Sequence, residues 1–184
     1  MMPNPQLILN QLGSGKEKAM YPKQRDLFGS LSRDFVEEIM NIAETESHKV
    51  GEMLFHEGDP ASWFYILLKG RIKLSLRQTG QFIYVVSNAG EVFGWSSLVG
   101  RSCYSASAEC MTAARLLRFG KKRLEKIIQK DAVNSLTLFK NLAAILGDRL
   151  MRGYTMNFFA AGDEAFTSLG TGQVMEVAET ELVI

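Results

Sequence analysis

Short apolar runs broken at intervals by glycine fill the middle of this 184-residue chain. Between Lys49 and Phe119 the runs are four to eight residues long, and glycines stand at positions 51, 58, 70, 80, 90 and 94. Runs of this length are typical of strands, and the glycines between them suit tight turns. The pattern therefore predicts a mainly β domain, a roll or a barrel, with helices flanking it in the sequence.

The strand signal can be assigned segment by segment. Gly51–Asp59 indicates a strand that closes in a Gly-Asp turn, and Trp63–Leu74 indicates two strands around a central glycine. A hairpin turn at 78–81 leads into a return strand at Phe82–Val86. The last strands are expected within Ser105–Phe119.

Helical periodicity lies on both sides of these strands. Leu31–Ala43 places apolar residues on one side and acids on the other, and Ser32 suits its N-cap. A second helix begins near Lys121 and ends at Asp131, and we interpret its cations as a solvated face rather than a patch for nucleic acid or lipid. The longest helical pattern runs over residues 133–159.

That longest helix carries two apolar stripes. One stripe contains Leu138, Leu142 and Ile145. The other repeats at alternating spacings of four and three and contains Phe139, Ala143, Leu146, Leu150 and Gly153. Two stripes need two covering surfaces, of which one is the β domain and the other, most simply, the same helix of a second subunit. We therefore expect a homodimer, with a protein partner for the long helix or the tail as the alternative.

The loop from Gly90 to Ala106 is the candidate binding site. Gly90 and Gly94 let the backbone turn tightly and approach a bound group closely, and the small polar residues after Gly94 suit the first turn of a short helix. Backbone N–H groups in such a turn can hold phosphate.

Together with the strand order, this loop resembles the phosphate-binding cassette of the cyclic nucleotide-binding domain in the catabolite activator and related bacterial regulators. In that family the cassette reads roughly Gly-Glu-Leu-Phe-Gly-Glu-x-Ala-Leu and is closed by Arg-Ser-Ala or Arg-Thr-Ala. This chain matches it at Gly90, Glu91, Phe93, Gly94, Leu98, Ser105 and Ala106. The resemblance implies a cyclic nucleotide-binding-type β-roll (jelly-roll-like) and a long C-terminal dimerisation helix that closes over the base.

The chain departs from the family at the ligand contacts. Trp95 stands where the family has the glutamate that holds the ribose hydroxyl, and Tyr104 stands where it has the arginine that pairs with the cyclic phosphate. On the base side the family has a Thr-Ser pair, whereas this chain offers Tyr154 after a glycine, with Thr155 one place late. The ribose and phosphate contact residues of a cyclic nucleotide are thus replaced.

Several anion donors remain in the loop. They are the backbone N–H groups of Gly94–Ser97, the hydroxyls of Ser96, Ser97 and Ser105, and Arg101 as a substitute cation. Three interpretations stay open: a pocket filled by Trp95, a non-standard small effector, and ordinary cyclic AMP or cyclic GMP. We expect a regulatory sensor that responds to a small effector through a helix-mediated dimer. The alternative is a degenerate domain with a filled pocket that serves in dimerisation or protein interaction.

Composition and charge limit the partners. The net charge is +1 and 46% of the residues are hydrophobic, so no general basic field indicates nucleic acid. Residues 160–184 hold five acids and no Lys or Arg, too little for a helix-turn-helix domain with a basic face. We expect a flexible arm at 1–25, a domain at 26–160 that includes the long helix, and an acidic tail at 161–184. With no apolar run of about 18 residues or more, we expect no membrane span and a cytoplasmic protein.

The few histidines and cysteines disfavour metal chemistry. Cys103 and Cys110 do not form a disulfide framework, and we expect two free, buried thiols. A cupin-type metal site needs a His-x-His pair, but here His56 is followed by Glu57 and a glycine, and no nucleophile stands beside a second histidine. We therefore expect neither a metal site nor an enzyme. A haem-sensing variant with His48, His56 or Cys103 as axial ligand is the weaker alternative.

Overall fold

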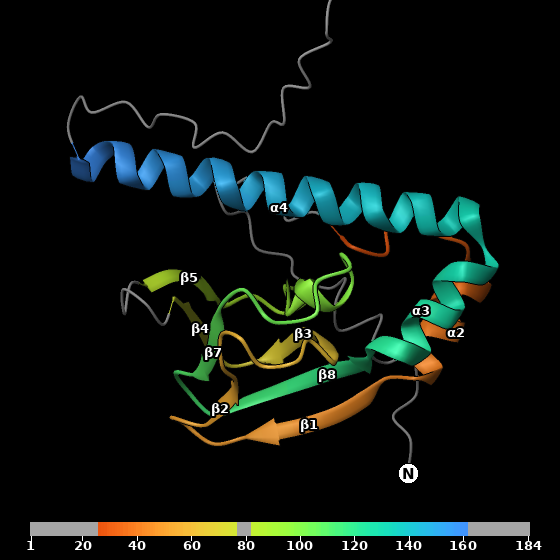
Figure 1. Ribbon diagram of the computed structural model, residues 1–184, viewed down its shortest axis with the longest axis horizontal. Helices are drawn as coiled ribbons and strands as arrows, with labels where there is room; N and C mark the ends of the chain where they lie inside the picture. The colour runs from red at the N-terminus through yellow and green to blue at the C-terminus, as the bar shows by residue number, and fades with distance from the viewer. Residues whose placement is uncertain (1–25, 77–81, 162–184) are drawn as a thin grey trace, which may run out of the picture.

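The structure, a computed structural model, describes residues 26–76 and 82–161, and its strands form two four-stranded antiparallel sheets (Figure 1). The first sheet has the order β1-β8-β3-β6. Its strands are β1 (Glu44–His48), β8 (Ala114–Gly120), β3 (Trp63–Lys69) and β6 (Val92–Phe93). The second sheet has the order β2-β7-β4-β5. Its strands are β2 (Met53–Phe55), β7 (Ser107–Cys110), β4 (Ile72–Ser75) and β5 (Phe82–Val86).

Helices cover one end and one side of this roll (Figure 1). The helices are α2 (Arg33–Asn41), α3 (Lys121–Lys130) and α4 (Ala132–Ala161), and η1 (Trp95–Ser97) is a short 3-10 helix. Ser32 caps α2 by accepting a hydrogen bond of 3.3 Å from Phe35 N. Asp131 separates α3 from α4 and accepts from Asn134 N at 3.0 Å, so the acid that ends one helix caps the next.

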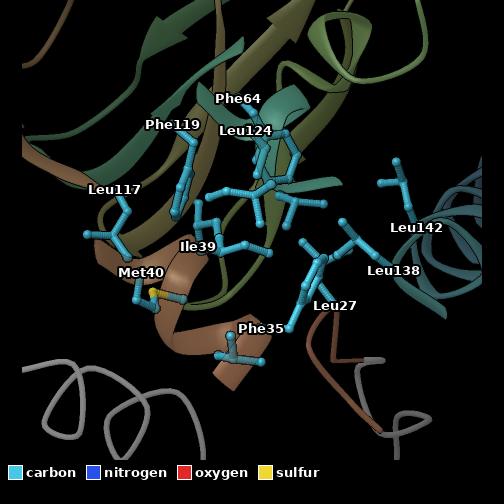
Figure 2. Packing of buried hydrophobic residues seen from close by; sticks show 14 residues of the cluster. Leu27, Phe35, Ile39, Met40, Phe64, Leu117, Phe119, Leu124, Leu138 and Leu142 are labelled. Carbon is cyan, nitrogen blue, oxygen red and sulfur yellow. The ribbon is translucent and has the colours of Figure 1, made fainter. Parts of the chain in front are cut away.

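A first hydrophobic core lies between the first sheet and the three helices. Figure 2 shows side chains from these elements converging, among them Phe35, Phe64, Leu124 and Leu138. Leu142 of α4 closes this core and is 2% exposed. The buried stripe predicted for the long helix is thus confirmed at Leu138 and Leu142.

A second core fills the space between the two sheets. Alternate residues of β3 divide between the cores, because Phe64 and Ile66 belong to the first and Tyr65 and Leu67 to the second. The ring of Phe55 stacks on the ring of Tyr104 with centroids 3.7 Å apart, and Tyr65 stacks on Phe93 at 5.0 Å. The interior of the roll is therefore packed with aromatic side chains.

The sequence prediction of a mainly β roll with flanking helices is confirmed. Two details were wrong: β1 was not predicted, and the strand expected at Gly51–Asp59 is only the three residues of β2. The hairpin turn predicted at 78–81 and the tail at 162–184 lie outside the described residues. Of the helices in the described part of the chain, none combines the length and apolar character that a membrane span needs.

The two cysteines were predicted to be buried, and this is wrong for one of them. Both thiols are free, but Cys103 is exposed while Cys110 is buried. Cys103 lies in the loop before β7, where its backbone forms an isolated bridge with Pro60 outside the named strands.

Candidate functional site

The cassette loop begins with a turn that is bound to the first sheet. Gly90 N donates to Leu67 O at 2.8 Å and Leu67 N donates to Glu91 O at 2.9 Å, so the loop enters β6 beside β3. Strand β6 then pairs Phe93 with Tyr65. Of the predicted cassette residues, Phe93 lies in β6, while the backbones of Gly90 and Glu91 are hydrogen-bonded to β3.

Gly94 turns the chain from β6 into η1. Its φ of +68° lies in the left-handed region, and a Cβ at this position would stand 2.9 Å from Cδ2 of Tyr65 and 3.0 Å from Trp63 O. Any larger residue would therefore be strained by its backbone and would clash with β3.

The serine groups predicted to hold an anion are largely occupied within the loop. Ser97 is buried, and both its N and its Oγ donate to Gly94 O, at 3.2 and 2.9 Å. Ser96 Oγ lies 3.3 Å from Ser105 Oγ and accepts from Ser105 N at the same distance. The structure thus brings Ser96 and Ser105 together, whereas the Ser97 hydroxyl is bound to the backbone of its own turn.

Tyr104, which the sequence comparison placed where the family has its arginine, is buried inside the roll. It is 5% exposed, and its hydroxyl donates to Trp63 O at 2.8 Å and accepts from Trp63 N at 3.0 Å. Burial raises the pKa of this phenol, so it stays neutral. A neutral, fully hydrogen-bonded hydroxyl gives no charge to a ligand phosphate.

Trp95 and Arg101 differ in their surroundings. Trp95 is half-buried and packs against the first core. Arg101 is exposed and lines a shallow hollow of about 540 Å³ together with Tyr104 and Ser105. The backbone of Ala106 lies just before β7, and its side chain is half-buried.

Glu91, which the sequence marked as a match to the cassette, is a buried carboxylate with three partners. Its Oε1 accepts from the Tyr84 hydroxyl at 2.8 Å, and its Oε2 accepts from Ser87 N at 2.7 Å and Asn88 N at 2.9 Å. This carboxylate ties the end of β5 to the start of the cassette. Burial, followed by the hydrogen bond to Glu91, raises the pKa of Tyr84.

Arg149 on α4 joins this group from the other side and was missed by the sequence analysis. The Cζ of its guanidinium lies 4.8 Å from the centroid of the Tyr84 ring. Arg149 follows Leu138, Leu142 and Ile145 at spacings of four, three and four, and thus lies on the buried stripe of α4. The signal that would have identified this residue is a charged side chain within an apolar stripe.

The residues of the stripe predicted to form a dimer differ in how exposed they are. Phe139 and Leu146 are half-buried, whereas Ala143, Leu150 and Gly153 are exposed. Tyr154 and Thr155, predicted to face the base, fall in the last turns of α4, and their side chains lie outside the described part.

The histidines form no metal site with their neighbours. His48 has its Nδ1 2.8 Å from Glu52 Oε1 and its Nε2 3.3 Å from Glu46 Oε2, so both ring nitrogens face carboxylates. Within the described ranges, no three His, Cys, Asp or Glu side chains gather as a metal-binding group.

Comparison with known proteins agrees with this geometry. The profile of the cyclic nucleotide-binding domain family matches residues 45–131. This part of the chain is a domain of the cyclic nucleotide-binding family. The resemblance predicted from the sequence is therefore confirmed, and the family consists of regulatory domains.

Solved structures share the fold of this domain. A protein from Geobacter metallireducens GS-15 described as cyclic nucleotide-binding superposes with a TM-score of 0.62 at 27% identity, covering 67% of this chain and 91% of that one. A cyclic nucleotide-binding domain from Methylobacillus flagellatus KT gives a TM-score of 0.66 at 17% identity, covering 88% and 86%. The catabolite activator protein of Thermus thermophilus gives 0.57 at 23% identity, covering 73% of this chain and 62% of that one.

A curated relative is described as a channel protein. A Rhodopseudomonas palustris (strain ATCC BAA-98 / CGA009) protein described as a potassium channel is 24% identical over 105 residues, which are 57% of this chain. The match spans only 26% of that relative's length. What the two share is thus one domain within a longer protein.

Proposed function

We propose that this chain is a regulatory module of the cyclic nucleotide-binding type that senses a small effector and transmits its binding to α4. The observation that carries the proposal is the Glu91–Tyr84–Arg149 arrangement. Glu91 belongs to the cassette, Tyr84 to β5 and Arg149 to α4, and they are linked by a 2.8 Å hydrogen bond and a 4.8 Å cation–ring contact. A change at the cassette therefore has a direct physical route to the long helix.

The effector in this proposal differs from an ordinary cyclic nucleotide. A family arginine at position 104 would give a phosphate a charge-assisted hydrogen bond, a class of contact that contributes about 1.5 to 3 kcal/mol. Tyr104 instead directs its hydroxyl to the Trp63 backbone. Arg101 and Ser105 at the rim of the hollow are the groups left to bind an anion on the cassette side.

The alternative function is a domain with a filled pocket that serves in protein interaction. The stacking of Tyr104 on Phe55, at 3.7 Å between centroids, favours it because the rings occupy the interior of the roll. In this case the module would bind no small molecule, and its output would be the surface of α4.

In either case we propose a dimer formed through α4 and no enzymatic activity, in a cytoplasmic protein. Leu136, Ala143 and Leu150 are seven residues apart and all exposed, which is the spacing of a coiled-coil seam. A second copy would cover this seam with the same residues.

A thermal-unfolding scan with cyclic AMP, cyclic GMP, cyclic dinucleotides and small metabolites tests the sensor against the filled pocket. A ligand at a hundredfold excess over its Kd adds about 2.7 kcal/mol and should raise the midpoint by roughly 5 to 10 °C. A rise with any of these compounds supports the sensor. An unchanged midpoint with all of them supports the interaction module.

A further inference from the structure

The guanidinium of Arg149 contains a buried hydrogen-bond donor that has no acceptor. Its Nη2 is buried, and across the side chains that the structure describes it is the one buried nitrogen or oxygen without a hydrogen-bond partner. Its guanidinium lies over the ring of Tyr84. A buried donor without an acceptor lowers the stability of the folded state, and an acceptor brought by a ligand would remove that cost.

The neighbouring carboxylate does not satisfy this donor. Both oxygens of Glu91 accept from other groups, Oε1 from Tyr84 and Oε2 from Ser87 N and Asn88 N. Desolvation lowers the pKa of Arg149, while Tyr84 and Glu91 oppose that effect. These neighbours hold the guanidinium in place, but they leave its Nη2 without a hydrogen-bond acceptor.

The local charge selects a class of ligand. Arg149 and Arg152 supply two positive charges next to Tyr84, and Glu91 supplies one negative charge. A ligand with a single negative charge, on a carboxylate or on a phosphodiester, would balance this group, whereas a dianion would add excess negative charge beside Glu91. The planar fork of a guanidinium also matches the two oxygens of a carboxylate.

We infer that the effector is a small monocarboxylate that accepts a hydrogen bond from Arg149 Nη2 between β5 and α4. The anion is then bound by the long helix and not by the cassette. This inference rests on the proposed sensor function. Because the ligand bridges the roll and α4, its binding fixes the second half of the helix against Tyr84.

The test is the thermal midpoint of the full chain in 10 mM sodium benzoate or sodium acetate, with 10 mM sodium chloride as the salt control. We expect a rise of about 2 to 5 °C with at least one carboxylate. Arg149→Met should abolish the rise, and Arg149→Lys should retain part of it because the charge remains. Arg101→Met is the matched control, since this arginine lies at the cassette rim, and it should keep the full rise.

The midpoint without ligand supplies a second readout. We expect Arg149→Met to unfold at the same temperature as the wild type or higher, because the substitution removes a buried cation with an unpaired donor. A fall of more than about 3 °C would make the guanidinium a structural contact and overturn the inference.

The outcomes separate this inference from the proposed function. A carboxylate response that survives in Arg149→Met overturns the inference alone. So does a cyclic nucleotide response that survives in Arg149→Met but is lost in Ser105→Ala, which would locate the effector at the cassette. A response to a cyclic dinucleotide or metabolite of the panel that survives in Arg149→Met likewise overturns the inference alone. No response to either carboxylate or to any compound of the panel overturns both proposals.

Discussion

In the first half of α4, Leu138 and Leu142 are buried and Asn141 Nδ2 donates to Leu27 O at 3.0 Å and Gly29 O at 2.8 Å, whereas in the second half Leu150 is 54% and Met151 63% exposed. The first half is fastened by apolar packing and by hydrogen bonds to the segment before α2. The second half meets the roll through Arg149, a contact that leaves a donor unsatisfied. One helix thus combines an anchored part with a part whose position a ligand or a partner can change.

The strongest test of this comparison truncates one leucine in each half. We expect Leu142→Ala to lower the free energy of unfolding by about 2 to 5 kcal/mol, because it leaves a cavity in the first core. Leu150→Ala should change it by less than about 0.5 kcal/mol in the monomer, since the side chain is exposed. Urea unfolding at low protein concentration measures both. Equal losses would mean that the two halves are equally anchored.

A second test asks whether the exposed half is covered by another copy. We expect Leu150→Glu to weaken the dimer by at least about 100-fold, because a symmetric interface loses two buried leucines at once. Analytical ultracentrifugation over a range of concentrations gives the dimer Kd. Lys126→Glu places the same acidic side chain at an exposed position of α3, with a larger change of charge, and should leave the dimer intact. If the wild-type protein remains monomeric at high concentration, the proposed dimer through α4 is wrong.

The smallest effect concerns the hydrogen bonds of the anchored half. We expect Asn141→Ala to destabilise the fold by about 1 to 2 kcal/mol, because two backbone carbonyls lose their donor. Lys140→Ala, at the exposed neighbouring position, is the control and should be close to neutral. If both variants unfold at the wild-type urea concentration, packing alone holds the first half.

Strand β1 shows why part of the fold escaped prediction. Its sequence, Glu-Thr-Glu-Ser-His, has no apolar alternation, whereas β3 and β5 are rich in apolar residues. β1 is held by charge instead: Arg118 Nη2 lies 2.8 Å from Glu44 and its Nη1 2.5 Å from Glu46, and Arg123 Nη2 lies 3.1 Å from Glu44. These partners come from residues more than 70 positions later, so no local pattern could indicate the strand.

The sequence was enough to predict which residues of the site differ from the family, but not which groups their side chains contact. The replacement of the two ligand-contacting residues by Trp95 and Tyr104 could be seen directly in the sequence. That the Tyr104 hydroxyl would bind the backbone of Trp63, 41 residues earlier, could not, because it depends on how the two sheets meet. The Tyr84–Arg149 contact likewise joins residues 65 positions apart.

Gly94 shows that one residue of a binding motif can be required by the fold alone. The glycine is required because a side chain would collide with Tyr65 and Trp63, contacts that belong to the architecture of β3 and exist with or without a bound molecule. Gly94 is therefore explained by the backbone turn between β6 and η1. The residues that would bind a nucleotide can change without affecting this turn. In this chain the glycine follows from how β6 meets β3, and the side chains around it decide what the loop can bind.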